Sequence, residues 1–349
     1  MSFLERLGVA LPIIQAPMAG VSTPAMAAAV TNAGALGSIA VGAADAAGAT
    51  DMIRALQTLT PGSFNVNVFV HAAPRRDAAR ERAWLEKMAP LFAGFGAAPP
   101  TELRTIYKSF AEDDDMLAAL VTARPRVVSF HFGLPDRTRI AALKAAGCIL
   151  LSTATNLAEA EAARDAGIDA VVAQGYEAGG HRGVFDPSAP DDRLGTLSLT
   201  RLLVLGSGLP VIAAGGIMDG AGVSAALALG AAAGQLGTAF IACPESGADD
   251  AYRQALQGPG AAHTAMTRAI SGRPARCLPN RFTAWGGAVE DAEIPDYPVA
   301  YDAGKALHAA ARASGESGFG AKWAGQGAPL ARTLRAAALV ARIASEMRG

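Results

Sequence analysis

The chain has 349 residues, of which 51% are hydrophobic and 17% are charged, enough apolar sequence for one large domain or a barrel with an added segment. Its 30 basic and 31 acidic residues give a net charge of −1, without a block of either sign. This balance argues against a protein that binds nucleic acid or docks on an anionic membrane surface.

The cysteines and the apolar stretches bear on where the protein works. Cys148, Cys243 and Cys277 show no Cys-x-x-Cys spacing and cannot all pair, which favours a reduced, cytoplasmic protein. The first residues lack the basic start and sustained apolar run of a signal peptide. Residues 202–244 carry one charge, Asp219, but glycine and proline interrupt them as in buried parallel strands that alternate with helices. We therefore expect no membrane span.

Short apolar runs alternate with alanine-rich helical stretches along the chain. Several of the helical stretches are followed by a glycine, such as Gly147 or Gly167, suited to the left-handed residue that ends a helix. Eight strands in alternation with helices predict a (β/α)8 TIM barrel over residues 1–246. The predicted strands are Ile13–Ala16, Leu36–Val41, Phe64–Val70, Arg126–Phe130, Cys148–Thr153, Ala170–Gln174, Val211–Ala214 and Ala232–Leu236.

Two segments exceed what such a barrel needs. Residues 72–121 predict a helical insertion after the third strand. Residues 247–349 predict further helices and a loop region rich in proline, glycine and aromatic residues. Because this segment has neither a linker nor an apolar periodicity of its own, we expect a helical cap over the barrel mouth that contributes to the substrate pocket.

The loop after the sixth strand is the first candidate site. Loops at the carboxyl ends of barrel strands carry the active site, and Ala173–Gly183 (AQGYEAGGHRG) presents His181 directly after Gly179 and Gly180. His181 is therefore the best candidate for a functional titratable group. The alternatives are a histidine that caps a helix or binds a cofactor phosphate.

The loops after the seventh and eighth strands predict a phosphate site. Barrel enzymes commonly hold a phosphate there through backbone N–H groups, and Gly215, Gly216, Gly237 and Thr238 occupy these positions. No Walker or Rossmann fingerprint is present, so an adenine dinucleotide fold is disfavoured. We expect a phosphate-bearing cofactor in the barrel mouth.

Two other strand ends carry weaker signals. After the first strand, small residues would let a flat ring approach the backbone beside the polarizable Met18, although a tight turn without a ligand explains them equally well. Asn65 and Asn67 lie at spacing two on one face of the third strand. Their amides suit hydrogen bonds to a heterocycle or ordinary strand capping.

The remaining polar residues predict no metal site. The histidines lack the spacing of metal ligands, and Glu112–Asp115 is typical of a solvated helix start. His131, at the end of the fourth strand, suits either a pocket-lining or a catalytic role. Tyr297, Tyr301 and Lys305 recur every four residues and on a helix would form one face able to bind an anionic substrate, or an amphipathic surface strip.

In this order, the motifs resemble those of the class I nitronate monooxygenases, formerly called 2-nitropropane dioxygenases, along nearly the whole chain. The motifs are QAPMAGVSTP, FNVNVF, SFHFGLP, ATNLAEA, AQGYEAGGHRG, AAGGI, GQLGTAFIACPES, YPVAYDAGK and WAGQGA. The resemblance implies an FMN-containing barrel that oxidises alkyl nitronates with O2 to a carbonyl compound and nitrite or nitrate. It further implies propionate 3-nitronate as the substrate, detoxification as the role, and no need for reduced nicotinamide.

The resemblance also implies roles for individual residues. His181 matches the active-site histidine, which is the expected base when the substrate is a neutral nitroalkane. The expected pocket wall is Tyr107, His131, Tyr297, Tyr301 and Lys305. The expected cofactor-binding residues are Met18, Ala19, Gly20, Asn67, Gln174, Gly179, Gly180, Gly215, Gly216, Gln235, Leu236, Gly237 and Thr238.

Three other functions stay open. A flavin-dependent NADH:quinone reductase of the same barrel lineage would need a nicotinamide site. An enoyl-ACP reductase would need a basic patch for its acidic carrier protein, which the neutral charge balance disfavours. A flavin-storage protein would show no turnover. The expected partners are a small nitronate and O2, in a monomer or a homodimer.

Overall fold

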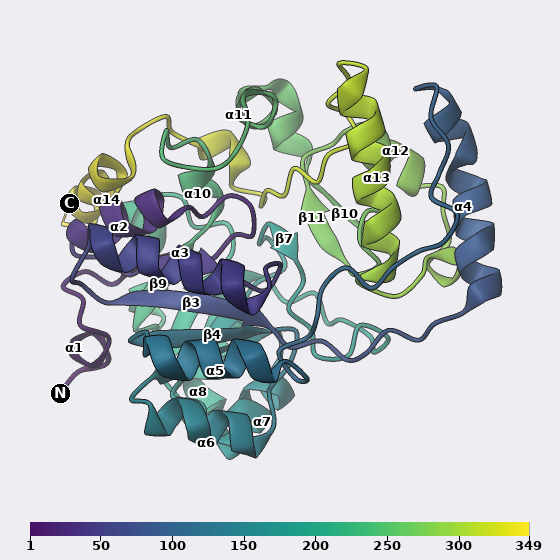
Figure 1. Ribbon diagram of the computed structural model, residues 1–349. Helices are drawn as coiled ribbons and strands as arrows, with labels where there is room; N and C mark the ends of the chain where they lie inside the picture. Colours follow the sequence, from purple (N-terminus) through teal and green to yellow (C-terminus); the bar gives the residue numbers. More distant parts are fainter. Residues whose placement is uncertain (349) are drawn as a thin grey trace.

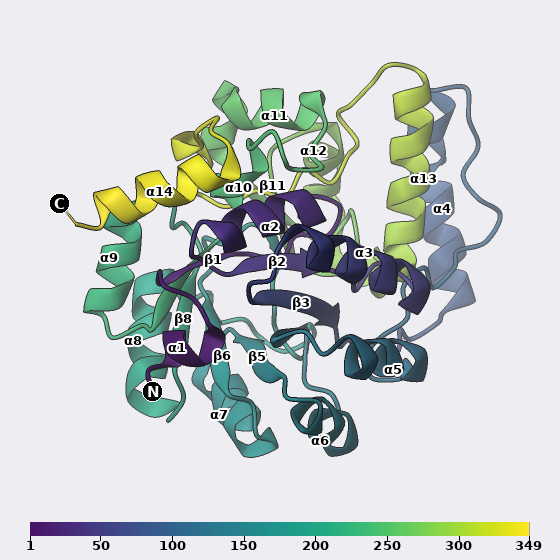
Figure 2. The same cartoon turned by 60° about the vertical axis from the view of Figure 1, so that its left-hand side comes forward.

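The computed structural model describes residues 1–348 and contains a barrel of eight parallel strands (Figures 1 and 2). The strands are β1 (Ile13–Gln15), β2 (Gly37–Ala40), β3 (Phe64–Phe69), β4 (Val127–His131), β5 (Ile149–Ala154), β6 (Ala170–Gln174), β8 (Val211–Ala214) and β9 (Ala233–Leu236). They pair in the order β1-β9-β8-β6-β5-β4-β3-β2, and a parallel bridge between Ile14 and Leu36 joins the two ends. The predicted (β/α)8 barrel is confirmed.

Helices surround the barrel strands. They are α2 (Pro24–Asn32), α3 (Ala46–Leu59), α5 (Asp114–Ala123), α6 (Arg137–Ala145), α7 (Leu157–Ala166), α8 (Thr196–Gly206) and α9 (Gly220–Ala228). Most begin at a side-chain cap, such as Asp136 for α6 or Asn156 for α7, which accepts from an N–H of the first turn. No helix within residues 1–348 combines the length and hydrophobicity needed to cross a membrane.

The two ends of the barrel differ. At the amino-terminal end, helix α1 (Phe3–Leu7) places Leu7 in a buried cluster with barrel residues such as Ile14 and Val127. At the carboxyl-terminal end, the loops are long and the cap segment lies over them (Figure 1). This is the end at which parallel barrels carry their sites.

The insertion after β3 is helical only in part. Helix α4 (Ala78–Ala93) packs beside α13 (Val299–Ala313) of the cap, and both views show the two helices side by side (Figures 1 and 2). Residues 94–113 form no helix, although a helical insertion was predicted over residues 72–121. Two glycines and the pair Pro99–Pro100 interrupt this stretch, and the latter removes backbone donors. The acidic run begins α5, as expected for a helix start.

The cap contains a small sheet besides its helices. The strands β7 (Gly180–His181), β10 (Ala265–Thr267) and β11 (Ala275–Cys277) pair antiparallel in the order β10-β11-β7. His181 lies opposite Ala275, so the loop after β6 is clamped to the cap. The other cap elements are α10 (Thr238–Ile241), α11 (Asp250–Gln257), α12 (Arg281–Gly286) and 3-10 turns at Pro259–His263, Asp291–Glu293 and Ala328–Leu330.

The last helix, α14 (Ala336–Glu346), lies outside the cap. It packs against α2 and α9, where an eighth barrel helix belongs (Figure 2). Its residues Leu339, Val340 and Ile343 are fully buried in a cluster with residues of both helices. The C-terminal segment therefore covers the mouth and also completes the outer layer of the barrel.

Candidate active site

A cavity of about 710 Å³ opens at the carboxyl ends of the barrel strands, within the usual size range of ligand sites. The site residues named from the sequence line it, except Leu236 and Asn65. Asn65 is fully buried and donates from Nδ2 to the Ser38 hydroxyl. The side chain of Leu236 is fully buried in the apolar layer between barrel and helices, while its carbonyl accepts from the N–H of Ala16. Further cavity residues were not foreseen: Pro17, Ser22, Ser129, Thr153, Ile217, Met218, Tyr252 and Trp323.

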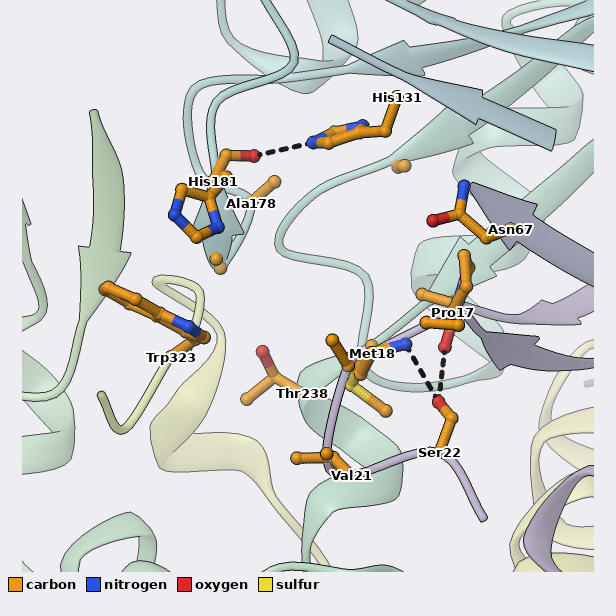
Figure 3. Close-up of a pocket in the computed structure, with 18 of the residues that line it drawn as sticks. Pro17, Met18, Val21, Ser22, Asn67, His131, Ala178, His181, Thr238 and Trp323 are labelled. Carbon is orange, nitrogen blue, oxygen red and sulfur yellow. Dashed lines mark hydrogen bonds between the residues drawn. The ribbon is translucent and has the colours of Figure 1, made fainter. Parts of the chain in front are cut away.

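Hydrogen bonds to the side chains of Ser22 and Gln15 fix the turn after β1. The Ser22 hydroxyl accepts from the N–H of Met18 at 2.9 Å (Figure 3). It also accepts from Nε2 of Gln15 at 2.8 Å. Gln15 is fully buried and its Oε1 accepts from the N–H of Ser38 on β2. This network fixes the backbone that brings Met18 to the cavity.

The glycines after β8 form a concave backbone. Gly215 and Gly216 have φ values of +122° and +69°, which residues with a side chain rarely adopt. Neither donates its N–H to a protein acceptor within residues 1–348, and both line the cavity. Consecutive free N–H groups of this kind bind anions. A Cβ on Gly215 would lie 2.7 Å from the hydroxyl of Thr196, so the space suits only glycine.

Two amide side chains face the cavity, and they differ in how many of their polar atoms are bonded to the protein. Asn67 donates from Nδ2 to the Ser129 hydroxyl at 3.0 Å, which leaves Oδ1 as an acceptor toward the cavity (Figure 3). Gln174 has both ends engaged by the histidine loop, since Nε2 donates to the His181 carbonyl and Oε1 accepts from Gly183. Gln174 therefore shapes this loop.

His131 has no free ring nitrogen. Its Nε2 lies 3.1 Å from the His181 carbonyl, which can only accept, so Nε2 carries the proton (Figure 3). Its Nδ1 then accepts from the Thr153 hydroxyl at 2.9 Å. Burial lowers its pKa to about 4, and the Arg273 charge acts in the same direction. His131 is thus a neutral support for the histidine loop.

His181 lies among aromatic rings. The ring centroids of Trp323, Tyr297 and Phe132 lie 5.0, 5.4 and 5.6 Å from its own. Burial lowers the pKa of His181 to about 3, with smaller contributions from His131 and Arg273. The imidazole is therefore neutral at physiological pH.

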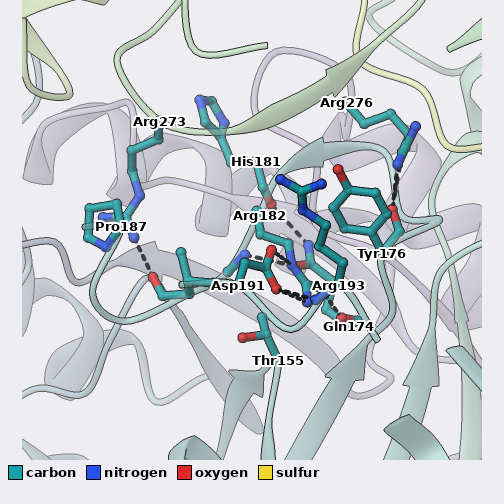
Figure 4. A network of polar contacts seen from close by, with 12 residues as sticks. Thr155, Gln174, Tyr176, His181, Arg182, Pro187, Asp191, Arg193, Arg273 and Arg276 are labelled. Atoms are coloured by element: carbon teal, nitrogen blue, oxygen red, sulfur yellow. Dashed lines mark hydrogen bonds and ion pairs between the residues drawn. The ribbon is translucent and has the colours of Figure 1, made fainter. Parts of the chain in front are cut away.

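Arginines fix the backbone around this histidine (Figure 4). The Arg182 side chain is 1% exposed, pairs with Asp191 at 2.8 Å and donates to the Gln174 carbonyl. Arg273 is also buried, with its guanidinium carbon 4.3 Å from the Phe132 ring centroid, and it forms no ion pair within residues 1–348. Burial lowers the pKa of Arg273 to about 10. A buried, unpaired cation behind the cavity favours an anionic ligand in front of it.

The opposite wall comes from the cap and the insertion. Lys305 on α13 holds its Nζ 4.9 Å from the ring centroid of Tyr107 and 5.6 Å from that of Tyr301. It forms no ion pair in the described part of the chain. Tyr297 lies just before α13, and burial raises the pKa of both Tyr297 and Tyr301, so these phenols stay protonated. Lys305 and Tyr301 therefore contribute an ammonium and a phenol to this wall, whereas the Tyr297 hydroxyl is buried without a hydrogen-bond partner within residues 1–348.

Known proteins resemble this chain over its full length. A sequence profile of the family described as nitronate monooxygenase matches residues 2–346. The nitronate monooxygenase of Paraburkholderia phytofirmans is 59% identical over 347 residues, which are 99% of this chain and 95% of that protein. The nitronate monooxygenase of Pseudomonas aeruginosa is 56% identical over 347 residues, 99% of both chains.

Solved structures agree with the sequence relatives. A nitroalkane oxidase from Streptomyces ansochromogenes has a TM-score of 0.88 at 42% identity, over 99% of this chain and 98% of that one. FabK from Thermotoga maritima has a TM-score of 0.74 at 28% identity, over 99% of this chain and 94% of that one. The chain therefore belongs to the nitronate monooxygenase family and is an oxidoreductase.

Proposed function

We propose that the protein is an FMN-dependent nitronate monooxygenase that uses O2 to oxidise alkyl nitronates to carbonyl compounds and nitrite or nitrate. The observation that carries the proposal is one cavity with two kinds of anion-binding wall. Free backbone N–H groups at Gly215 and Gly216 lie on the barrel side. Lys305 and the tyrosine hydroxyls lie on the cap side.

The barrel side fits FMN. Gly215 and Gly216, together with Gly237 and Thr238 after β9, would hold the phosphate. The turn at Met18, Ala19 and Gly20 would lie along the flavin ring, and Oδ1 of Asn67 would accept from a ring N–H. FMN, when bound, would supply the electron acceptor for the nitronate.

The cap side fits the substrate. A nitronate is an anion, so the Lys305 ammonium and the protonated hydroxyl of Tyr301 would bind it by charge-assisted hydrogen bonds. The buried charge of Arg273 adds to the attraction. With a neutral nitroalkane, the neutral ring of His181 would first accept the proton from the carbon beside the nitro group.

The proposed physiological substrate is propionate 3-nitronate, and the proposed role is its detoxification. Its carboxylate gives it a second negative charge, which suits the cationic wall at Lys305. The test is oxygen uptake by the purified protein with propionate 3-nitronate against NADH. We expect rapid uptake with the nitronate alone and release of FMN on denaturation. Fast anaerobic bleaching by NADH without nitronate turnover would favour a quinone reductase instead.

A further inference from the structure

Ser271 of the cap contacts His181 from a distant part of the chain. It lies between β10 and β11, is fully buried, and holds its Oγ 2.8 Å from Nε2 of His181 across 90 residues of sequence. Ser271 is not among the residues that line the cavity. Its contact is therefore with the histidine and not with a ligand.

The surroundings of Ser271 decide which group donates. Its Oγ lies 3.3 Å from the Arg273 carbonyl, and no other donor within residues 1–348 reaches that carbonyl. If the hydroxyl donates to this carbonyl, its oxygen accepts from Nε2–H of His181 and all three groups are satisfied. If the hydroxyl instead donated to His181, the carbonyl would lack a partner, which buried groups rarely do.

The other ring nitrogen of His181 is free. Nδ1 has no hydrogen-bond partner within residues 1–348. Nδ1 is not a buried atom, and because His181 lines the cavity, this nitrogen is accessible from there. The groups that face the ring are the neutral His131, the Arg273 cation and the phenols of Tyr297 and Tyr301. None of them favours a second proton on the ring.

We propose that Ser271 is a positioning residue that fixes His181 as the Nε2–H tautomer and thereby turns the lone pair of Nδ1 to the substrate. The inference deepens the proposed function, on which it rests. The Arg273 carbonyl, the Ser271 hydroxyl and the imidazole form one chain of hydrogen bonds that ends at the reacting proton. This chain couples the cap to the base on the barrel loop.

The first test separates the proton-transfer step from the rest of the reaction. In Ser271→Ala, we expect kcat/KM for nitroethane to fall about tenfold or more, because a base in the wrong tautomer loses most of its effect. For ethyl nitronate, which has already lost its proton, we expect a fall of about threefold at most. Ser271→Thr keeps the hydroxyl and should recover most of the nitroethane activity. Equal losses on both substrates in Ser271→Ala would overturn the proposal.

The second test needs no turnover. Nitrogen-15 NMR of histidine-labelled protein distinguishes the two tautomers, and the His181 signals are those that His181→Asn removes. We expect Nε2–H in the wild-type protein and a mixture of tautomers in Ser271→Ala. A dominant Nδ1–H form in the wild type, or an unchanged spectrum in Ser271→Ala, would contradict the assignment even if Ser271→Thr fails to fold.

The two proposals fail in different ways. If His181→Asn loses the same factor on nitroethane and ethyl nitronate, the role of His181 as a base is wrong, whatever Ser271 does. If His181→Asn loses nitroethane activity selectively and Ser271→Ala does not, the base stands and the role of Ser271 is wrong.

Discussion

His181 differs from a surface histidine in what surrounds each of its ring atoms. Aromatic rings surround the imidazole, one nitrogen is bound to Ser271, and the neighbouring cation disfavours a charged ring. His131, at the end of β4, has both ring nitrogens bonded to protein groups. The structure thus gives two adjacent histidines separate tasks.

Replacement of His181 by asparagine should nearly abolish turnover of neutral nitroalkanes and leave a substantial share of the activity on preformed nitronates. Loss of a general base typically costs about a hundredfold to ten-thousandfold, and a nitronate needs no base. Steady-state kinetics on nitroethane and ethyl nitronate measure the difference. Thr153→Ser serves as a control at the cavity wall, since it keeps the hydroxyl that donates to His131. Equal losses on both substrates would mean that His181 acts by position or charge.

The acid limb of the pH profile of kcat/KM for nitroethane should lie at lower pH than for an ordinary histidine base. Burial, aided by His131 and Arg273, lowers the pKa of His181 to about 3, so the base form already dominates well below pH 6.5. We expect kcat/KM for nitroethane to stay level from pH 8 down to about 5, whereas an ordinary histidine would lose activity from about pH 6.5 downward. The pH profile for ethyl nitronate, which needs no base, shows the contribution of titratable groups other than His181. An acid limb centred near pH 6.5 with nitroethane alone would contradict the expected environment.

The sequence predicted the site residues that lie at strand ends, but not those whose role depends on a contact with a distant part of the chain. Gly215, Gly216 and Asn67 stand directly after or within predicted strands, so barrel topology alone brought them to the mouth. Leu236 follows the same logic, but the alternation of a strand turns its side chain to the core. Ser271 has no local pattern, because its function depends on a contact across 90 residues.

At the level of elements, the eight barrel strands were predictable because most of their residues are buried, so that strands such as β5 and β6 appear as short apolar runs between helical stretches. The strand β7 was not, since it has two residues, one of them glycine, and exists only through its pairing with β11. The helix α14 was predicted to belong to the cap, because no pattern in its sequence indicates that its apolar face packs against α2 and α9. Pairing and docking partners are properties of the whole fold.

Helix α13 provides the element-level prediction. Lys305→Met should lower kcat/KM for propionate 3-nitronate about tenfold or more, since a charge-assisted hydrogen bond contributes about 1.5–3 kcal/mol. For propyl-2-nitronate, which lacks the carboxylate, we expect a smaller loss. Lys305→Arg keeps the charge beside Tyr107 and Tyr301 and should retain most of the selectivity. Equal effects of Lys305→Met on both substrates would assign Lys305 to the nitronate group or to the flavin.

At the level of the whole molecule, the cofactor site joins parts that are far apart in the sequence. The Thr238 hydroxyl accepts from the N–H of Gly325 at 2.9 Å, which ties the loop after β9 to the segment that precedes α14. Gly215 and Gly216 after β8 and the turn after β1 complete the same cavity. A ligand held by all of these segments should stabilise the barrel and the C-terminal segment together, because it binds only the folded chain.

Thr238→Asp tests this connection by charge alone. An aspartate oxygen can still accept from Gly325, but its charge would face the proposed phosphate, and like charges about 4 Å apart repel by roughly 4 kcal/mol at an effective dielectric constant of 20. We expect the variant to lose most of its FMN on dialysis and to melt at the lower temperature of flavin-free wild type. Thr238→Ser, which keeps the hydroxyl, should retain both FMN and melting temperature. The two variants share the hydrogen bond to Gly325 and differ in charge. Full FMN occupancy in Thr238→Asp would therefore show that the phosphate does not bind at this loop. Bound FAD in place of FMN would refute the proposed cofactor.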